Sequence, residues 1–488
     1  MPPTDDALPP DHVASGPPPG GRRTGHRAAS SISEHLDTRT AATEVAGRIH
    51  DDLAAPCDLV LVFASFHHAA ALPQAMESFR TTLDPGTLVA VTTESSVGPD
   101  RELEGLPGLS AVAMHLPGVR CTSWTGVPDV PVPISRPDEI PAHIHLEDDS
   151  RGIFLFGDPF STPITRLLPA LSTAVSDRTA PGAVPILGGM ASGASQPGHN
   201  VMVLNDQVIA AGAIGVTLAG DVQVDAIVSQ GCRPIAEPLV ITKTDGQVIL
   251  ELAGRRAVDV VQETTRALPE HERQLLSKGL LIGHVIDETR RPFGRGDFLV
   301  RSIVGVDKQR GGVVAADPIR PGQTVQLHAR DAVTAGEDLQ LLLDAQQLHE
   351  RPFAGALFTC NGRGERLFGE PNHDVGIIQR RIGPLPMAGF MAAGEIGPIG
   401  GRSFLHGHTA VLALLRAGPP ESIQADAEQI EATPPVEVAP LTPPAGFAEI
   451  EVDVDAAGDP LPPSPDPVVP NPLAPPKPAA PPEPEPLA

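Results

Sequence analysis

The chain has 488 residues, with 35 Lys+Arg against 60 Asp+Glu, a formal net charge of −25, no Tyr and one Trp. This balance disfavours nucleic acids and anionic membranes, whose phosphates need clustered cations, and it provides no aromatic platform for bases. No run of about 18 apolar residues predicts a membrane helix, and the first thirty residues contain no apolar signal-peptide core. We therefore expect a soluble cytoplasmic protein.

Both ends of the chain have the composition of disordered segments. Residues 1–45 begin with sequence rich in Pro, Gly and Arg, and residues 418–488 contain 21 prolines, 13 acidic residues and one basic residue, Lys477. Such segments bury too little apolar surface to offset the entropy of ordering, so we predict that both are disordered. The C-terminal tail then acts as a spacer. The alternative is a scaffold whose Pro–Pro pairs, or the alternating stretch Phe447–Asp455, dock on a partner.

The sequence between the tails predicts strands that alternate with helices in a first domain, residues 50–270. Asn205-Asp206 and Asp245-Gly246 are typical of tight hairpin turns. The predicted strands are 59–63, 88–92, 152–156 and 184–187, the hairpins are 200–212 and 239–250, and the helices are 71–83, 165–175 and 257–268.

A second domain is predicted at residues 275–416. The apolar run from Leu275 to Ile282 at its start would be exposed in an isolated half, so the two domains are expected to be interlocked. The fold class is thus α/β (mixed α+β), with two interlocked sheet-and-helix domains between disordered Pro-rich tails. The predicted strands are 279–283, 298–303, 324–328, 355–359 and 409–415, and the helices are 332–348 and 374–382.

The densest group of chemically useful residues follows the strand that ends at Cys360. Asn361-Gly362 is the pair best able to adopt positive φ, and such a turn exposes successive backbone N–H groups. With Arg363 and Gly364 beside it, the turn predicts a site for a carboxylate or phosphate. The alternative is an ordinary hairpin turn with a solvated arginine.

A second group is the glycine-rich loop between residues 394 and 402, which ends near His406 and His408. It is neither a phosphate-binding nor a dinucleotide-binding motif, because no G-K-[ST] follows and no strand precedes a G-x-G-x-x-G. We expect it to approach a ligand closely, with hydrogen-bonding rather than metal-binding histidines. Its candidate ligand-binding residues are Glu395, Gly397, Gly400, Gly401 and His406.

Three further strand ends run into polar or glycine-rich turns, at Asp158, at Gly188-Gly189 and at residues 92–96. Crevices of α/β sheets form at such ends, so we expect them to converge on one pocket, the alternative being ordinary connecting loops. His143 and His145 beside residues 147–149 resemble a metal site but fit a solvated acidic loop better.

The four cysteines form no C-x-x-C pair, which excludes a zinc ribbon or a thioredoxin motif. Cys360 with His373, Asp374 or His406 could form a thiol–histidine catalytic pair, giving a hydrolase or transferase. A free cysteine at a strand end is more often a packed hydrophobe. A haem-binding sensor is a third alternative.

The motifs around Cys360 resemble those of the C-terminal FIST domain, the name standing for F-box and intracellular signal transduction proteins. Thr359-Cys-Asn-Gly-Arg-Gly364, Leu367-Phe-Gly369, Ala388-Gly-Phe390, Gly394–Arg402 and Phe404-Leu-His-Gly407 occur in the order of that domain. Gly157-Asp-Pro-Phe-Ser161 and Gly188-Gly-Met-Ala-Ser192 are similar to the N-terminal FIST domain. The resemblance covers residues 50–416. It implies a cytoplasmic sensory module that binds a small ligand, for which amino acids are proposed.

From the residues and the resemblance together we expect a ligand-binding sensor that is not an enzyme and needs no metal or cofactor. Its partners would be a small molecule and a signalling protein in trans. Arg363 and the turn amides would hold an acidic group, while Glu395 and His406 would face an amine or hydroxyls.

Overall fold

The computed structural model describes residues 25–418 except 181, 290–291, 295 and 318, so the acidic C-terminal tail lies outside it. The prediction of disorder as far as residue 45 is wrong from Arg27 onward, where strand β1 and helix α1 form. Helix α1 begins after Asp37, whose carboxylate accepts a hydrogen bond from the backbone N–H of Thr40 at 2.8 Å. The helix buries a face of alanine, valine and isoleucine. The prediction missed this face because it used the average composition of residues 1–45.

The first 115 residues contain an order of elements that recurs along the chain: strand, helix, strand, helix, strand, hairpin and strand. The two central strands run parallel, the last strand pairs antiparallel with the first of them, and the first strand of the unit pairs antiparallel with the last. These elements are β1 (Arg27–Ser33), α1 (Thr38–Leu53), β2 (Leu59–Ser65), η1 (Phe66–Ala71), α2 (Leu72–Leu83), β3 (Thr87–Thr93), β4 (Ser96–Val97), β5 (Glu102–Leu103) and β6 (Leu109–His115).

The same order returns twice, with the same parallel and antiparallel pairings. We call the three copies repeats 1, 2 and 3. Repeat 2 comprises β7 (Val119–Gly126), η2 (Pro137–Glu139), α3 (Ile140–His143), β8 (Ser150–Gly157), α4 (Ile164–Ser176), β9 (Ile186–Met190), β10 (Met202–Leu204), β11 (Gln207–Ile209) and β12 (Ala213–Gly220). Repeat 3 comprises β13 (Val222–Gln230), α7 (Ala332–Gln346), β22 (Ala354–Cys360), α8 (Glu365–Phe368), α9 (His373–Ile382), β23 (Met387–Ala392), β24 (Glu395–Ile399), β25 (Arg402–His406) and β26 (Thr409–Ala417).

Each repeat places its hairpin in the sheet of another repeat. Hairpin β10–β11 pairs with β3, β24–β25 pairs with β9, and β4–β5 pairs with β23. The three sheets are therefore β1-β6-β2-β3-β10-β11, β7-β12-β8-β9-β24-β25 and β13-β26-β22-β23-β4-β5. This cyclic exchange confirms the predicted interlocked α and β architecture, in a form with three units where two were expected.

The repeats share one phenylalanine position, on the second strand of each repeat. Phe63 in β2, Phe156 in β8 and Phe358 in β22 form a nearly equilateral triangle, with ring centroids 5.8, 6.1 and 5.6 Å apart. Their edge-to-face contacts lie in the centre of the largest apolar cluster, where all three rings are buried. The core is thus aliphatic, as the composition predicts, around a small aromatic centre.

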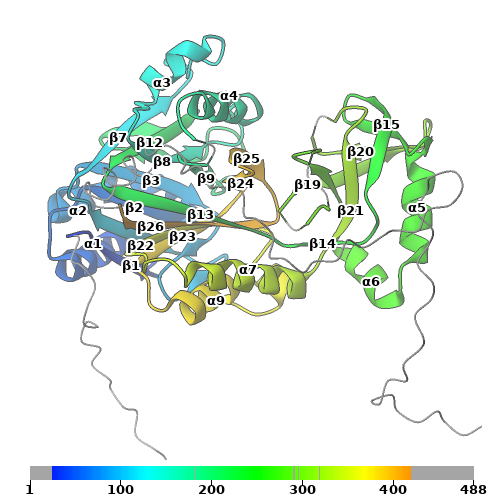
Figure 1. Cartoon of the computed structure of the whole chain (residues 1–488). Helices are drawn as coiled ribbons and strands as arrows, with labels where there is room; N and C mark the ends of the chain where they lie inside the picture. Colours follow the sequence, from blue (N-terminus) through cyan, green and yellow to red (C-terminus); the bar gives the residue numbers. More distant parts are fainter. Residues whose placement is uncertain (1–24, 181, 290–291, 295, 318, 419–488) are drawn as a thin grey trace, which may run out of the picture. The chain divides into compact units, whose positions relative to one another are not determined.

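Repeat 3 carries an insertion between β13 and α7, residues 231–331. Its antiparallel strands surround an apolar cluster of their own, and helices α5 and α6 belong to it (Figure 1). The predicted boundary between residues 270 and 275 falls inside this insertion. Its elements are β14 (Cys232–Pro234), β15 (Leu239–Asp245), β16 (Val248–Leu252), β17 (Arg255–Arg256), α5 (Ala257–Ala267), α6 (Glu270–Leu275), η3 (Leu276–Lys278), β18 (Leu280–Val285), β19 (Phe298–Asp307), β20 (Gly312–Ala315) and β21 (Thr324–Arg330).

Candidate functional site

The predicted strand ends of β3, β8 and β9 lie next to one another in the structure, and the end of β23 joins them; Ala191 N–H, after β9, donates to Gly157 O of β8 at 2.8 Å. Met391 N–H donates to Ser95 O at 3.1 Å, Ala393 N–H to Met190 O at 3.1 Å, and Gly193 N–H to Thr92 O at 3.3 Å. These backbone hydrogen bonds join the ends of β3, β9 and β23. The convergence therefore locks the repeats to one another, and its donors are not available to a ligand.

The glycines of β9 serve this packing. A Cβ on Gly188, whose φ is +147°, would lie 2.0 Å from Leu155 O, and a Cβ on Gly189 would lie 2.9 Å from the Cβ of Ala392. Both positions therefore require glycine for close approach of neighbouring strands. The prediction that they line a ligand pocket has no support in these contacts.

Ser65, Asp158 and Cys360 occupy equivalent positions, two residues after the phenylalanines of the triangle. At the end of β2, Ser65 Oγ accepts from Gly108 N–H at 2.9 Å. At the end of β8, Asp158 accepts from Asn200 Nδ2 at 2.9 Å and from the Ser161 hydroxyl. Ser65 thus links the end of β2 to the segment before β6, and Asp158 links its own turn to Asn200, so both side chains have structural partners.

The turn after Cys360 does not form the expected anion-binding concavity. Asn361 N–H donates to Ala392 O at 3.1 Å, Gly362 N–H to Cys360 Sγ at 3.4 Å, and Arg363 N–H to Cys360 O at 2.8 Å. Gly364 has a φ of +59°, which favours glycine, and the Glu104 carboxylate lies against it, 2.4 Å from the place of a Cβ. The amides close the turn itself, which corrects the prediction that they hold a ligand.

Arg363 is fully buried and is already paired with a carboxylate from its own domain. Its Nε and Nη2 each donate to Asp374 at 2.8 Å, and Thr359 Oγ1 donates to the same carboxylate at 2.9 Å. The guanidinium holds the pKa of Asp374 well below its usual range. We expected the guanidinium to be free for a ligand, but Nε and Nη2 are occupied by Asp374. Only Nη1 has no hydrogen-bond partner among the described residues.

Glu395 is also fully buried and lies beside the thiol of Cys360. Its Oε2 accepts from Thr409 N–H at 3.1 Å, while its Oε1 has no partner within the described part of the chain. Burial raises the pKa of Glu395 to about 8. Burial, with the nearby Glu395, also raises the pKa of the Cys360 thiol to about 12, the opposite of what a cysteine nucleophile needs.

The two histidines of the glycine-rich loop point to different partners. His406 Nε2 donates to Gly397 O at 2.9 Å, whereas His408 Nε2 is 3.2 Å from the Ser302 hydroxyl of the insertion. Burial lowers the pKa of both to about 4. Gly400 and Gly401 have positive φ in the β24–β25 turn. The loop thus makes a hairpin, and of its predicted residues only Glu395 lies at Cys360.

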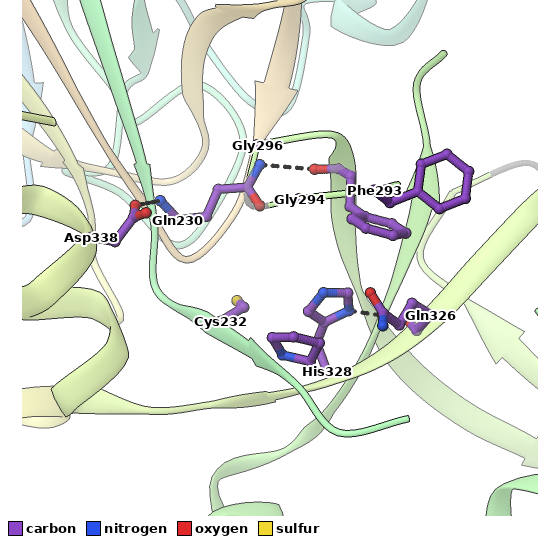
Figure 2. A pocket seen from close by; sticks show the side chains of 10 residues that line it. Gln230, Cys232, Phe293, Gly294, Gly296, Gln326, His328 and Asp338 are labelled. Carbon is purple, nitrogen blue, oxygen red and sulfur yellow. Dashed lines mark hydrogen bonds between the residues drawn. The ribbon is translucent and has the colours of Figure 1, made fainter. Parts of the chain in front are cut away.

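A pocket of about 140 Å³ lies next to this cluster and was missed by the sequence motifs (Figure 2). The pocket wall includes Cys232. Burial raises the pKa of its thiol, and the nearby charges of Arg330 and Arg363 oppose that rise. Phe298 and His328 contact each other edge to face, with centroids 5.4 Å apart. The pocket is lined by Gln230, Cys232, Pro234, Phe293, Gly294, Gly296, Phe298, Gln326, His328 and Asp338.

Hydrogen bonds to the backbone fix the orientation of the polar pocket residues. Gln230 Nε2 donates to Phe298 O at 2.8 Å, Gln326 Nε2 to Ala236 O at 2.7 Å, and His328 Nδ1 to Gln326 O at 3.0 Å. Since a carbonyl only accepts, the proton of the neutral His328 ring is on Nδ1. Burial lowers the pKa of His328 to about 4, so the ring stays neutral at physiological pH.

Family comparison decides the identity of the chain. The FIST N domain matches residues 58–255 and the FIST C domain matches residues 257–398. The chain belongs to the FIST family. It is 35% identical over 399 residues to an uncharacterized protein of Mycobacterium tuberculosis, covering 80% of this chain and 99% of that protein. It is 36% identical over 389 residues to an uncharacterized protein of Mycobacterium bovis, covering 78% and 96%.

FIST domains are sensory domains of signal transduction, which agrees with the expected class of function. Among solved structures, a cyanuric acid hydrolase from A. caulinodans aligns over 81% of this chain and 100% of its own, at 8% identity and a TM-score of 0.32. That score is too low to support any conclusion about activity.

Both FIST domains contribute to the pocket. Gln230, Cys232 and Pro234 come from the FIST N match, whereas the other lining residues come from the FIST C match. Within the described ranges, no group of three His, Cys, Asp or Glu side chains could hold a metal ion. In the same residues, no helix is both long enough and apolar enough to cross a membrane.

Proposed function

We propose that this FIST protein is a non-catalytic sensor that binds a small amine, with an amino acid as the preferred ligand, in the pocket of Figure 2. One observation carries the proposal. Three polar side chains of the pocket donate to backbone carbonyls and so keep an acceptor atom each, which makes the pocket complementary to a ligand that donates.

Three acceptors follow from the hydrogen bonds that fix the pocket. Because Gln230 and Gln326 donate through Nε2, their Oε1 atoms remain as acceptors, and His328 offers the lone pair of Nε2. The carboxylate of Asp338, which accepts from Gln230 N–H at 3.0 Å, adds negative charge to the same wall. An ammonium group has three donors and a positive charge, and satisfies such a set.

The aromatic lining favours the same chemistry. The faces of Phe293, Phe298 and His328 present negative quadrupoles, which attract a cation that has been taken out of water. The volume of about 140 Å³ is below the ~300–1,000 Å³ of pockets for drug-sized ligands. It therefore suits a ligand of amino-acid size and is too small for a nucleotide or a haem.

The position of the pocket supports a sensory role. Its lining residues come from β13 and α7 of repeat 3 and from β14, β19 and β21 of the insertion, so a bound ligand contacts both repeat 3 and its insertion. Binding there stabilises one arrangement of these elements over others, which a signalling protein in trans could read.

Matched ligand pairs test the proposal in the full-length protein by thermal shift. Alanine is compared with lactate, which replaces the ammonium by a hydroxyl, and with ethylamine, which lacks the carboxylate. We expect alanine and ethylamine to raise the melting temperature and lactate to leave it unchanged, because only the two amines supply an ammonium group. At 100 times its Kd a ligand adds about 2.7 kcal/mol to stability. Stabilisation by lactate and not by ethylamine would contradict the amine proposal.

A single substitution locates the site. His328→Phe keeps an aromatic ring but removes the Nε2 acceptor, so we expect the amine shift to fall by at least half. His349→Phe, at an exposed position, is the matched control and should respond as the wild type does. An unchanged response in His328→Phe would exclude this pocket.

A further inference from the structure

Each repeat begins with a strand at the end of a sheet, and these three strands, β1, β7 and β13, differ in what bonds to their main chains. In β7, Cys121 O accepts from the Thr87 hydroxyl at 3.3 Å, and in β13 the Gln230 N–H donates to Asp338 at 3.0 Å. Within the described ranges, the main chain of residues 28–32 in β1 hydrogen-bonds only to β6. The outer edge of β1 is therefore left unpaired.

Two cavities lie along this edge. One, of about 350 Å³, touches residues 28–30, and the other, of about 300 Å³, touches residues 30–32. Successive side chains of a strand point to opposite faces, so a space touched by three successive residues lies at the edge of the strand and not over one face. The cavities share the lining residues Ser30, Asp52, Pro99 and Asp100, and together form one groove, which we call the β1 groove.

The β1 groove has a wall on each side. Ser33 Oγ donates to Glu44 of α1 at 2.5 Å, whereas Ser30 Oγ accepts from the Met387 N–H of β23 at 3.0 Å, so α1 and repeat 3 flank opposite faces of the strand. A second copy of the protein would bring its own helix layer against these walls. One extended chain of about five residues, at roughly 3.3 Å per residue, matches residues 28–32 instead.

The two arginines that line the groove already have acidic partners. Arg48 pairs with Glu44 at 2.5 Å, and Arg101 pairs with Glu34 at 2.9 Å and with Asp100 at 3.1 Å. Two further arginines lie nearby and bond to neutral groups. Arg27 donates to Ala54 O at 3.3 Å, and Arg351 donates to Pro384 O at 2.7 Å.

The unpaired negative charge of the groove lies in the last turn of α1. No lysine or arginine of the described ranges forms an ion pair with Asp51 or Asp52, and Asp51 has only the exposed His50 at 3.5 Å. Both carboxylates are exposed, at the end of the helix where the backbone dipole is also negative. Acidic residues are unfavourable there, so a cation supplied by a partner would be stabilised.

We propose that the β1 groove binds an extended peptide of a partner protein as an added strand, with lysine or arginine side chains of the peptide on Asp51 and Asp52. The main chain of the peptide pairs with β1, and its side chains alternate between the two walls. The groove shares no residue with the amine pocket, so this proposal does not rest on the proposed function. The competing explanation is an edge that its flanking charges keep unpaired.

Fluorescence anisotropy of labelled peptides with the full-length protein tests the proposal. The probe is acetyl-Thr-Lys-Val-Lys-Val-Lys-Thr-amide, and its controls are the same peptide with glutamate for lysine and the lysine peptide with N-methylated central residues. We expect saturable binding of the probe, with a Kd at least about tenfold lower than that of either control. No saturable binding, or equal binding of the N-methylated peptide, would overturn the proposal.

Two other occupants are distinguished in the same assay. The segment Phe447–Asp455 alternates apolar and acidic residues, and as a free peptide it should bind at least about tenfold more weakly than the probe. Tighter binding of that peptide would assign the groove to the acidic tail and overturn the proposal. Dimers that the probe disperses in light scattering would assign the groove to a second copy, with the same consequence.

A variant tests the role of the two aspartates. Asp51→Asn combined with Asp52→Asn should raise the Kd of the probe by about tenfold, whereas Asp148→Asn, at an exposed acid in another loop, should leave it unchanged. An unchanged Kd in the double variant would overturn the assignment to these carboxylates.

Hydrogen exchange of the wild-type protein locates the added strand without any variant. Saturating probe should slow exchange in peptides covering residues 27–33, and it should leave residues 119–126 and 222–230, the equivalent strands β7 and β13, unchanged. Binding of the probe with no added protection at residues 27–33 would overturn the proposal.

Discussion

The ends of β8 and β22 are equivalent in topology and differ in chemistry. At β8, Asp158 accepts from the side chains of Ser161 and Asn200, so its carboxylate completes a turn. At β22, Cys360 is surrounded by buried charged groups, two of which, Arg363 and Glu395, retain unpartnered atoms within the described residues. The comparison shows that two repeats place a side chain with ordinary hydrogen-bond partners at this position, while repeat 3, which also carries the insertion, places a thiol among buried charged groups there.

The hairpin positions show the same contrast. Ser96, Met202 and Glu395 stand opposite equivalent residues of β23, β3 and β9. Ser96 donates its hydroxyl to two main-chain oxygens and Met202 is apolar and buried, but Glu395 places a carboxyl group in the interior. Burying that group costs stability, so its presence at only one of three equivalent positions indicates a functional requirement.

The largest expected effect concerns the buried ion pair of repeat 3. Asp374→Ala leaves Arg363 charged and unpaired in the interior, and we expect a loss of about 3–5 kcal/mol in the free energy of unfolding. Asp158→Ala removes only two hydrogen bonds and should cost about 1–3 kcal/mol. Urea unfolding of both variants measures the difference, and equal losses would contradict the contrast between the two strand ends.

The phenylalanine triangle tests the equivalence of the repeats. Phe63→Leu, Phe156→Leu and Phe358→Leu change volume little and should each cost about 1 kcal/mol. Because the three rings have similar surroundings, we expect losses that agree within about 0.5 kcal/mol in thermal unfolding. One variant far more costly than the others would show that the triangle is not symmetrical in energy.

The buried carboxyls predict a particular dependence on pH. The folded pKa values of Glu102 and Glu395, about 8, are above their ordinary value of 4.5, so the folded state binds more protons than the unfolded state. Stability should therefore fall as pH rises from about 5 to 8. This slope is set by the difference in bound protons between the folded and unfolded states. Glu395→Gln should reduce that difference by up to one proton, whereas Glu94→Gln, at a partly exposed residue paired with Arg366, should leave it unchanged.

The smallest effect is kinetic. Iodoacetamide should label Cys360 in the native protein at pH 7 far more slowly than in urea, because the thiol is buried and its pKa is raised. Mass spectrometry of the peptide containing Cys360 measures both rates. Fast labelling of the native protein near pH 6 would favour the thiol-dependent hydrolase or transferase instead.

Much of the secondary structure could be predicted from sequence. The apolar runs at residues 59–63 and 152–156 are strands β2 and β8, and both hairpin turns are present, with Asn205 at positive φ. The strands missed by the prediction include β7 and β13, in which polar and apolar residues mix. A phenylalanine near the end of an apolar run occurs in all three repeats and could have revealed them. The insertion makes the spacing to the third copy longer, so the repeats show no constant period in the sequence.

The site could be predicted only in part. Sequence reasoning singled out Cys360, Arg363 and Glu395, which the structure places near one another, because turn residues and glycine-rich motifs are visible locally. It did not reveal that α9 brings Asp374 to Arg363 and so occupies most of the guanidinium. The pocket was missed because Gln230 and His328 are about a hundred residues apart and share no motif.

Hydrogen exchange with and without the most stabilising amine tests the central contrast most directly. If repeat 3 and its insertion alone bind the ligand, protection should increase in peptides covering residues 228–234 and 326–340. Peptides covering the ends of β2 and β8, residues 63–68 and 156–162, should exchange at unchanged rates. Protection at the β2 or β8 ends, with none at residues 326–340, would contradict the account.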